Sequence, residues 1–125
     1  MQWPPPLLII EDNEKNLKLV RDLLRFKGYR TLEAATAAEG IALAGEHQPD
    51  LILMDIQLPD LGGDQALARL RENPETASIP VVALTAMAMQ GDEARLLAAG
   101  FRGYLAKPIS AWDFPEQVRR FCEGA

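Results

Sequence analysis

The strongest constraint on the fold is an alternation between short apolar runs and longer segments that carry helix signals. The clearest apolar runs are residues 7–10, 51–54 and 81–84, and weaker candidates occupy 30–34 and 103–106. The clear runs are continuous rather than alternating in polarity, which is typical of strands buried on both faces of a parallel sheet. The pattern therefore predicts five parallel strands, each followed by a helix.

Five segments with helix signals follow these runs. Asn13 is a favoured N-cap for the first helix. Thr36 and Glu39 form a capping box at the start of the second helix, and Asp113 and Glu116 form another at the start of the last. The expected helices run from Asn13 to Gly28, from Thr36 to the residue before Pro49, over 64–72 and 90–99, and onward from Ser110 or Asp113.

These elements belong to one domain. A chain of 125 residues has room for a single domain of ordinary size. Residues 1–6 end in three prolines, which favour polyproline II, so we expect a stiff lead-in at 1–6 before a domain at 7–125. The predicted fold class is α/β: a doubly wound (βα)5 five-stranded parallel sheet with right-handed crossovers and helices on both faces.

The charge balance and the scarcity of Cys and His exclude several kinds of site. Asp and Glu total 18 against 13 Lys and Arg, so the net charge of −5 argues against a nucleic-acid partner. One Cys and one His exclude a disulfide framework and a metal site built on several thiolates or imidazoles. The apolar run 7–10 is too short for a signal peptide or a membrane span, so we expect a cytoplasmic protein without a membrane partner.

Polar side chains stand where four of the expected strands end. Glu11 and Asp12 follow the first strand, Asp55 the third, Thr85 the fourth and Lys107 the fifth. The carboxyl ends of parallel strands share one edge of the sheet, and ligands of such folds bind there. We therefore expect these five side chains to gather on one rim.

Three carboxylates on one rim need a cation. At an effective dielectric constant near 20, like charges about 5 Å apart repel by about 3 kcal/mol per pair. Hard carboxylate oxygens without His or Cys suit Mg²⁺, with Mn²⁺ as the alternative. With the ammonium of Lys107 and the hydroxyl of Thr85, the cluster predicts a phosphoryl site. Asp55, on a separate strand, is the candidate acyl-phosphate nucleophile.

Four motifs carry a resemblance to a known family: Glu11-Asp12-Asn13, Met54-Asp55-Ile56-Gln57-Leu58-Pro59, Leu84-Thr85-Ala86 and Ala106-Lys107-Pro108. In this order and at these spacings they resemble the receiver (CheY-like) domains of two-component response regulators, over residues 7–122. Asn16 and residues 87–92 and 107–110 are similar to single-domain regulators of the DivK type and to receivers of phosphorelays and hybrid kinases. The resemblance implies a flavodoxin-like, CheY-like sheet with strand order 2-1-3-4-5.

The resemblance also implies a role for each acidic residue. Asp55 would accept a phosphoryl group from a histidine of a sensor histidine kinase or of a histidine phosphotransfer protein. Asp12, Asp55 and the main-chain carbonyl of Gln57 would bind the metal. Glu11 would hold a metal-bound water or ligate the ion directly.

The remaining site residues would act on the phosphoryl group. Thr85 would hydrogen-bond one of its oxygens, Lys107 would pair with it, and Tyr104 would turn inward when Thr85 moves. The resemblance also implies a cis peptide bond between Lys107 and Pro108. Three flanking positions would set access to the phosphoryl group and its lifetime: Ala86, Gln57 and Met87.

The implied function is a phosphorylation switch, and not a turnover enzyme. Phosphorylation would repack the face formed by the fourth helix, fifth strand and fifth helix, and a downstream protein would bind there. The chain would act as a single-domain response regulator, monomeric or weakly dimeric. Two related alternatives stay open: a receiver excised from a hybrid kinase or phosphorelay protein, and a pseudo-receiver scaffold that never takes phosphate.

Two other classes of protein bind phosphate or use an acid at the end of a parallel strand. A haloacid-dehalogenase-type hydrolase needs a second acid two residues after its nucleophile, where this chain has Gln57. An electron-transfer flavoprotein needs a hydroxyl- and Gly-rich loop after the first strand, where Glu11 and Asp12 would repel phosphate. The sequence has neither pattern, and it has no glycine motif of a nucleotide site.

Overall fold

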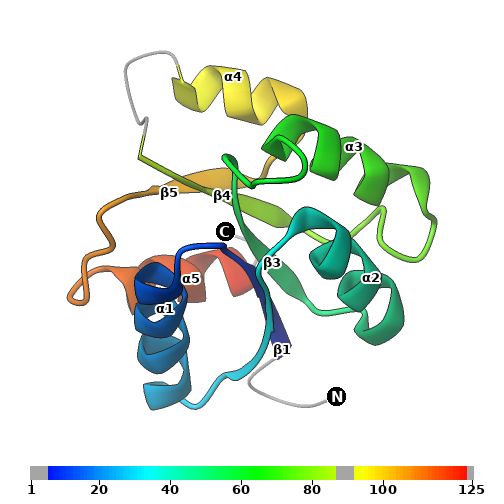
Figure 1. The fold of residues 1–125 in the computed structure, drawn as a ribbon. Coiled ribbons are helices and arrows are strands. Elements are labelled where there is room, and N and C mark those ends of the chain that lie inside the picture. Colours follow the sequence, from blue (N-terminus) through cyan, green and yellow to red (C-terminus); the bar gives the residue numbers. More distant parts are fainter. Residues whose placement is uncertain (1–5, 87–91, 124–125) are drawn as a thin grey trace.

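The computed structural model describes residues 6–86 and 92–123, in which five parallel strands alternate with five helices (Figure 1). In hydrogen-bonding order the strands run β2-β1-β3-β4-β5, so the predicted α/β class and strand order are confirmed. The strands are β1 (Pro6–Ile10), β2 (Arg30–Ala34), β3 (Leu51–Asp55), β4 (Val81–Thr85) and β5 (Gly103–Ala106). The helices are α1 (Glu14–Phe26), α2 (Ala37–His47), α3 (Gly63–Glu72), α4 (Asp92–Ala99) and α5 (Phe114–Cys122).

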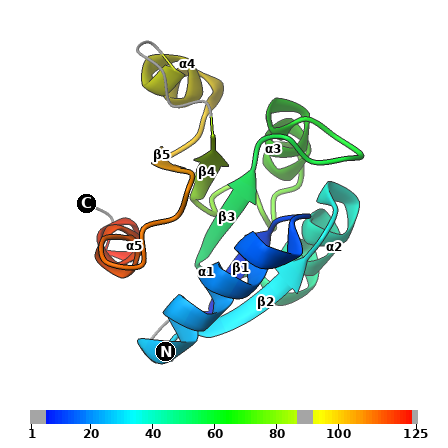
Figure 2. The same ribbon diagram turned by 60° about the vertical axis from the view of Figure 1, so that its left-hand side comes forward.

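Helices cover both faces of the sheet (Figure 2). One face packs against α1 and α5, through residues that include Leu24 and Val118. The other packs against α2, α3 and α4, through residues that include Leu70 and Leu96. Every residue of β4 is at most 2% exposed, which explains why the central strands are continuously apolar in sequence.

Local signals place several helix ends where the sequence predicted them. Asn13 is the N-cap of α1, and its side chain accepts a hydrogen bond from the N–H of Asn16 at 3.0 Å. Gly28 and Gly100 follow α1 and α4 with φ angles of 92° and 112°, a left-handed conformation that glycine adopts without strain. In the part of the chain that the structure describes, no helix combines the length and the apolar character that a bilayer crossing requires.

The start of β1 differs from the prediction. The strand begins at Pro6, the last residue of the expected lead-in. The carbonyl of Pro6 accepts the N–H of Asp50 at 3.0 Å. A proline is tolerated at the first position of a strand because it still offers this acceptor. Helix α4 begins at Asp92 in the structure, and the predicted start at residue 90 lies outside the described residues.

The capping box predicted at the start of α5 is wrong. The helix begins at Phe114 with Pro115 in its first turn, as expected, but Asp113 has a helical backbone and its side chain caps no N–H. Glu116 is bound instead to the guanidinium of Arg119, one turn further along the helix. A carboxylate held by an arginine in this way is not available to the backbone at the helix start.

Candidate functional site

The site lies where the carboxyl ends of β1, β3, β4 and β5 meet. Asp55 and Thr85 are the last residues of β3 and β4, Glu11 and Asp12 follow β1, and Lys107 follows β5. Because neighbouring strands are parallel, these ends share one edge of the sheet (Figure 1). One carboxylate oxygen each from Glu11, Asp12 and Asp55 lies within 4.8 Å of the others. The structure thus brings together the acids that the sequence places at strand ends.

Lys107 supplies a positive charge inside this cluster. Its Nζ lies 2.6 Å from Oε1 of Glu11 and 2.9 Å from Oδ2 of Asp55, and its side chain is 14% exposed. Only the contact with Asp55 has hydrogen-bonding geometry. Glu11 Oε1 is therefore a buried oxygen with a cation beside it but without an aligned donor among the described residues. The peptide bond from Lys107 to Pro108 is cis, as the resemblance implied.

The loop that follows β3 also binds the side chain of Asp55. Its Oδ1 accepts the N–H of Gln57 at 2.8 Å, and the residue is 6% exposed. Burial raises the pKa of Asp55, but hydrogen bonds from Glu11, Gln57 and Lys107 outweigh that effect and bring the pKa below its ordinary value. Asp55 is therefore ionised at neutral pH, the form in which a carboxylate can act as a nucleophile.

Glu11 is the fully buried member of the cluster. Burial, together with a hydrogen bond to Asp55, raises the pKa of Glu11 from 4.5 to about 7. The ammonium of Lys107 beside the carboxylate, and a hydrogen bond from the N–H of Asn13, which lies 3.2 Å from Oε2, act in the opposite direction. Near neutral pH, a proton on Glu11 therefore relieves part of the repulsion between the two buried carboxylates.

The other predicted residues at this edge differ in their exposure. Thr85 is 2% exposed, so it lies on the buried side of the site. Asp12, Gln57 and Ala86 are exposed. The cluster is consequently open to solvent on the side of these three residues, where a small ion or a partner could approach.

The remaining predicted residues are Tyr104 and Met87. Tyr104 of β5 is half-buried and packs against the core between the sheet and helices α2, α3 and α4. Met87 lies outside the described residues.

The loop between β3 and α3 presents Gln57. This residue and Gly62 pair as an isolated antiparallel bridge, and the N–H of Gly63 donates to the carbonyl of Ile56 at 3.0 Å. At the far end of the loop, the carboxylate of Asp60 accepts backbone N–H groups from α2. No pattern in the sequence predicts this contact, because it joins two segments that are distant along the chain.

The donor set fits a hard divalent cation. The converging ligand atoms are carboxylate oxygens of Glu11, Asp12 and Asp55, and the buried Oε1 of Glu11 lacks an aligned donor. Oxygens of this kind suit Mg²⁺ or Mn²⁺, and Mg²⁺ takes one or two carboxylates and keeps several waters. The exposure of Asp12 leaves a path by which a hydrated ion can enter.

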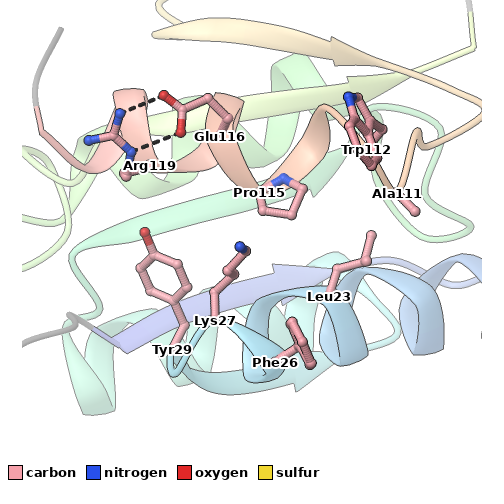
Figure 3. A pocket seen from close by; sticks show the side chains of 9 residues that line it. All are labelled: Leu23, Phe26, Lys27, Tyr29, Ala111, Trp112, Pro115, Glu116 and Arg119. Atoms are coloured by element: carbon pink, nitrogen blue, oxygen red, sulfur yellow. Dashed lines mark hydrogen bonds and ion pairs between the residues drawn. The ribbon is translucent and has the colours of Figure 1, made fainter.

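A separate groove of about 910 Å³ lies between α1 and the start of α5 (Figure 3). Phe26 and Trp112 line it and are 86% and 92% exposed. Glu116 and Arg119 form an ion pair along its α5 wall (Figure 3). The groove includes none of the residues predicted to react, so it is distinct from the acidic cluster.

Comparison with known families decides what kind of domain carries this site. The family described as the response regulator receiver domain matches residues 7–119. The chain belongs to the receiver domain family. Membership in this family sets aside the hydrolase and flavoprotein alternatives. The receiver has a CheY-like fold, as the motifs implied.

Individual relatives of this receiver are similar over almost their whole length. Its sequence is 46% identical over 118 residues to that of the polar-differentiation response regulator DivK of Brucella anthropi. The match covers 94% of this chain and 96% of the relative. Among solved structures, the receiver domain of a sensor histidine kinase from Pseudomonas aeruginosa is 34% identical, with a TM-score of 0.85. That match covers 95% of this chain and 98% of the other, and that structure has a magnesium ion coordinated in its active site cleft. The chemotaxis response regulator CheY4 of Vibrio cholerae has the same fold, with a TM-score of 0.86 and 23% identity. That match covers 92% of this chain and 96% of the other.

Proposed function

We propose that this receiver accepts a phosphoryl group on Asp55 from a phosphohistidine of a sensor histidine kinase or of a histidine phosphotransfer protein. The observation that carries the proposal is the 2.9 Å contact between Asp55 and Lys107, within a cluster that includes Glu11 and Asp12. The 46% identity to a DivK regulator supports the same assignment.

In the transfer, a carboxylate oxygen of Asp55 attacks phosphorus and the P–N bond of the phosphohistidine breaks. The electron pair of that bond stays on the imidazole nitrogen, and the ring leaves neutral when its other nitrogen carries the proton. Lys107 pairs with the phosphoryl oxygens, since it already lies beside Asp55. Thr85 donates its hydroxyl to another phosphoryl oxygen, and the small side chain of Ala86 leaves the phosphorus accessible.

We assign Mg²⁺ or Mn²⁺ to the acidic cluster. Asp12, Asp55 and the main-chain carbonyl of Gln57 would hold the ion, and Glu11 would hold a metal-bound water or ligate the ion directly. When bound, the cation supplies charge neutralisation for the carboxylates and for the phosphoryl oxygens. The magnesium in the cleft of the Pseudomonas aeruginosa receiver supports this assignment.

Phosphorylation of Asp55 would work as a switch. It adds negative charge at the end of β3, toward which Thr85 would move, and Tyr104 would then turn inward. The face formed by α4, β5 and α5 would repack, and a downstream protein that prefers the repacked face would shift the equilibrium by its differential affinity. Gln57 and Met87 would tune the lifetime of the phosphorylated state. In this proposal the chain is a monomeric or weakly dimeric phosphoacceptor and not a turnover enzyme.

The test is intact-mass spectrometry of the full chain with Mg²⁺ and acetyl phosphate. We expect a gain of about 80 Da, the mass of one phosphoryl group, in the wild type. Asp55→Asn preserves the size of the side chain and is expected to abolish the gain, as is an excess of chelator. Asp22→Asn, which removes an exposed carboxylate from α1, is the matched control and should gain the same mass.

A second arm identifies the phosphodonor. Transfer of labelled phosphate from each histidine kinase and phosphotransfer protein of the source organism would name the partner. Absence of any transfer, together with an unchanged mass in acetyl phosphate, would favour the pseudo-receiver scaffold.

A further inference from the structure

Asp60 joins the loop after β3 to the start of α2. Its Oδ1 accepts the N–H of Ala37 at 2.9 Å, and its Oδ2 accepts the N–H of Ala38 at 2.9 Å. Ala37 and Ala38 are the first two residues of α2, so one carboxylate from a distant segment takes two of the N–H groups that a helix start leaves unpaired.

The contact does more than cap a helix, because α2 has its own cap. The side chain of Thr36 accepts the N–H of Glu39 at 3.2 Å, which is the local capping interaction that the sequence predicted. The hydrogen bonds from Ala38 and Ala37 lower the pKa of Asp60, so the side chain is a charged anchor at the positive end of the helix dipole.

The loop that carries Asp60 is closed at its base. The bridge between Gln57 and Gly62 and the hydrogen bond from Gly63 to Ile56 hold its two ends together. A Cβ at Gly63 would lie 2.8 Å from Cα of Ile56, which shows how closely the two ends approach. The same loop donates the N–H of Gln57 to Asp55 at 2.8 Å. Movement of the tip at Asp60 would therefore be transmitted to the backbone beside Asp55.

We propose that Asp60 is a positioning residue for the metal site: by binding α2 it holds the loop so that the main-chain carbonyl of Gln57 stays directed at the cation. This inference rests on the proposed function, which assigns that carbonyl as a ligand. Two charge-assisted hydrogen bonds to a rigid helix restrict the loop before the ion arrives. Without them, only the closed base of the loop would hold the carbonyl. Part of its ordering would then occur at the moment of binding, and affinity would fall.

The test is isothermal titration calorimetry of Mg²⁺ into the full chain. Asp60→Ala is expected to raise the Kd about threefold to tenfold, somewhat less than the roughly 10- to 100-fold effect of groups that hydrogen-bond a metal ligand directly. Asp60→Asn keeps one acceptor oxygen and should lie between Asp60→Ala and the wild type. An unchanged Kd in Asp60→Ala would overturn the proposal.

Two controls separate positioning from other effects. Thr36→Ala removes the local cap of the same helix and leaves the loop intact, so its Kd should stay within about twofold of the wild type. Asp64→Ala removes an exposed charge from the first turn of α3 and should behave likewise. If either control weakened Mg²⁺ binding as much as Asp60→Ala, the effect would belong to helix stability or to charge, and the proposal would fail.

A second measurement does not depend on the metal. In chelator, amide exchange at Gln57 is expected to be faster in Asp60→Ala than in the wild type or in Thr36→Ala. A wild type that binds no Mg²⁺ would contradict the proposed function, and the exchange rate would still test the anchoring. Equal exchange at Gln57 in all three proteins would show that Asp60 does not hold the loop.

Discussion

Lys107 Nζ lies 2.9 Å from Oδ2 of Asp55, although 52 residues separate the two along the chain. The same ammonium approaches Oε1 of Glu11 at 2.6 Å. One partly buried cation thus compensates two carboxylates, and a proton on Glu11 compensates part of the remaining charge near neutral pH. The stability of this edge of the sheet therefore depends on lysine, protons and divalent cations together.

Replacement of Lys107 by Met should destabilise the protein in chelator. The cost of removing one partner from a buried ion pair is about 3–5 kcal/mol, and we expect about 1–3 kcal/mol here because Glu11 can take up a proton. Urea unfolding measures the loss, and added Mg²⁺ should restore more stability to this variant than to the wild type. Lys18→Met, which breaks only an exposed pair with Asp22, should change stability by less than about 0.5 kcal/mol. Equal stability of the Lys107 variant and the wild type in chelator would contradict this view of the site.

Asp12→Asn should have opposite effects with and without the metal. Asp12 is exposed beside two buried carboxylates, so removal of its charge relieves repulsion and should raise the melting temperature slightly in chelator. The same change removes a proposed ligand, so the increase in melting temperature on addition of Mg²⁺ should shrink or vanish. Thermal unfolding in chelator and in excess Mg²⁺ measures both effects. A lower melting temperature in chelator would mean that Asp12 stabilises the fold by another route.

The raised pKa of Glu11 predicts that stability falls as pH rises. The folded protein holds a proton up to about pH 7 that the unfolded chain releases near the ordinary value of 4.5. The contribution of this group is therefore complete below about pH 4.5 and is lost between there and pH 7, and it amounts to at most about 3 kcal/mol. The pKa of Asp55 is lowered, so its contribution to stability changes only below its ordinary value of 3.8. The pKa of Lys107 is raised, so its contribution changes only near and above its ordinary value of 10.5. Neither group therefore affects how stability changes between pH 4.5 and pH 7.

Glu11→Gln checks the pH prediction. Glutamine is neutral at every pH, so in chelator this variant should match the wild type near pH 5 and exceed its stability near pH 8. Urea unfolding at the two pH values gives the difference. A wild type that gained stability relative to Glu11→Gln over this interval would show that Glu11 is ionised in the fold well below pH 7.

Two glycines of α2 should respond in opposite ways to alanine. A Cβ at Gly40 would overlap Cδ1 and lie 2.6 Å from Cγ1 of Ile10, whose side chain is fully buried. A Cβ at Gly45 would meet no atom closer than Nδ2 of Asn73, at 3.8 Å. Gly45→Ala should stabilise the helix by up to about 1 kcal/mol, and overpacking in Gly40→Ala should outweigh the same gain and cost about 1–3 kcal/mol. Denaturant unfolding of both variants checks this, and a stabilised Gly40→Ala would mean that Ile10 can repack.

Much of the fold could be predicted because its signals are local. The side chain of Asn13 binds an N–H three residues away, and Gly28 ends α1 through its own backbone conformation. Strands that are buried on both faces of the sheet have continuous apolar sequences, so they could be predicted as strands from the sequence. The capping box predicted at Asp113 was wrong because Glu116 has two possible local partners, the backbone at the helix start and the side chain of Arg119. In the structure Glu116 binds Arg119.

The sequence by itself determined the order of strands and helices, the helix caps near α1 and α2, and which reactive side chains stand at strand ends. The strand order came from the family resemblance and not from any spacing. Only the tertiary structure decided that three acids converge within 4.8 Å, that Lys107 lies between two of them, and that Asp60 reaches α2. The physical reason is distance along the chain: caps and strand runs depend on neighbours a few residues away. Ion pairs, shifted pKa values and the anchoring of a loop arise only when packing on both faces of the sheet brings remote segments together.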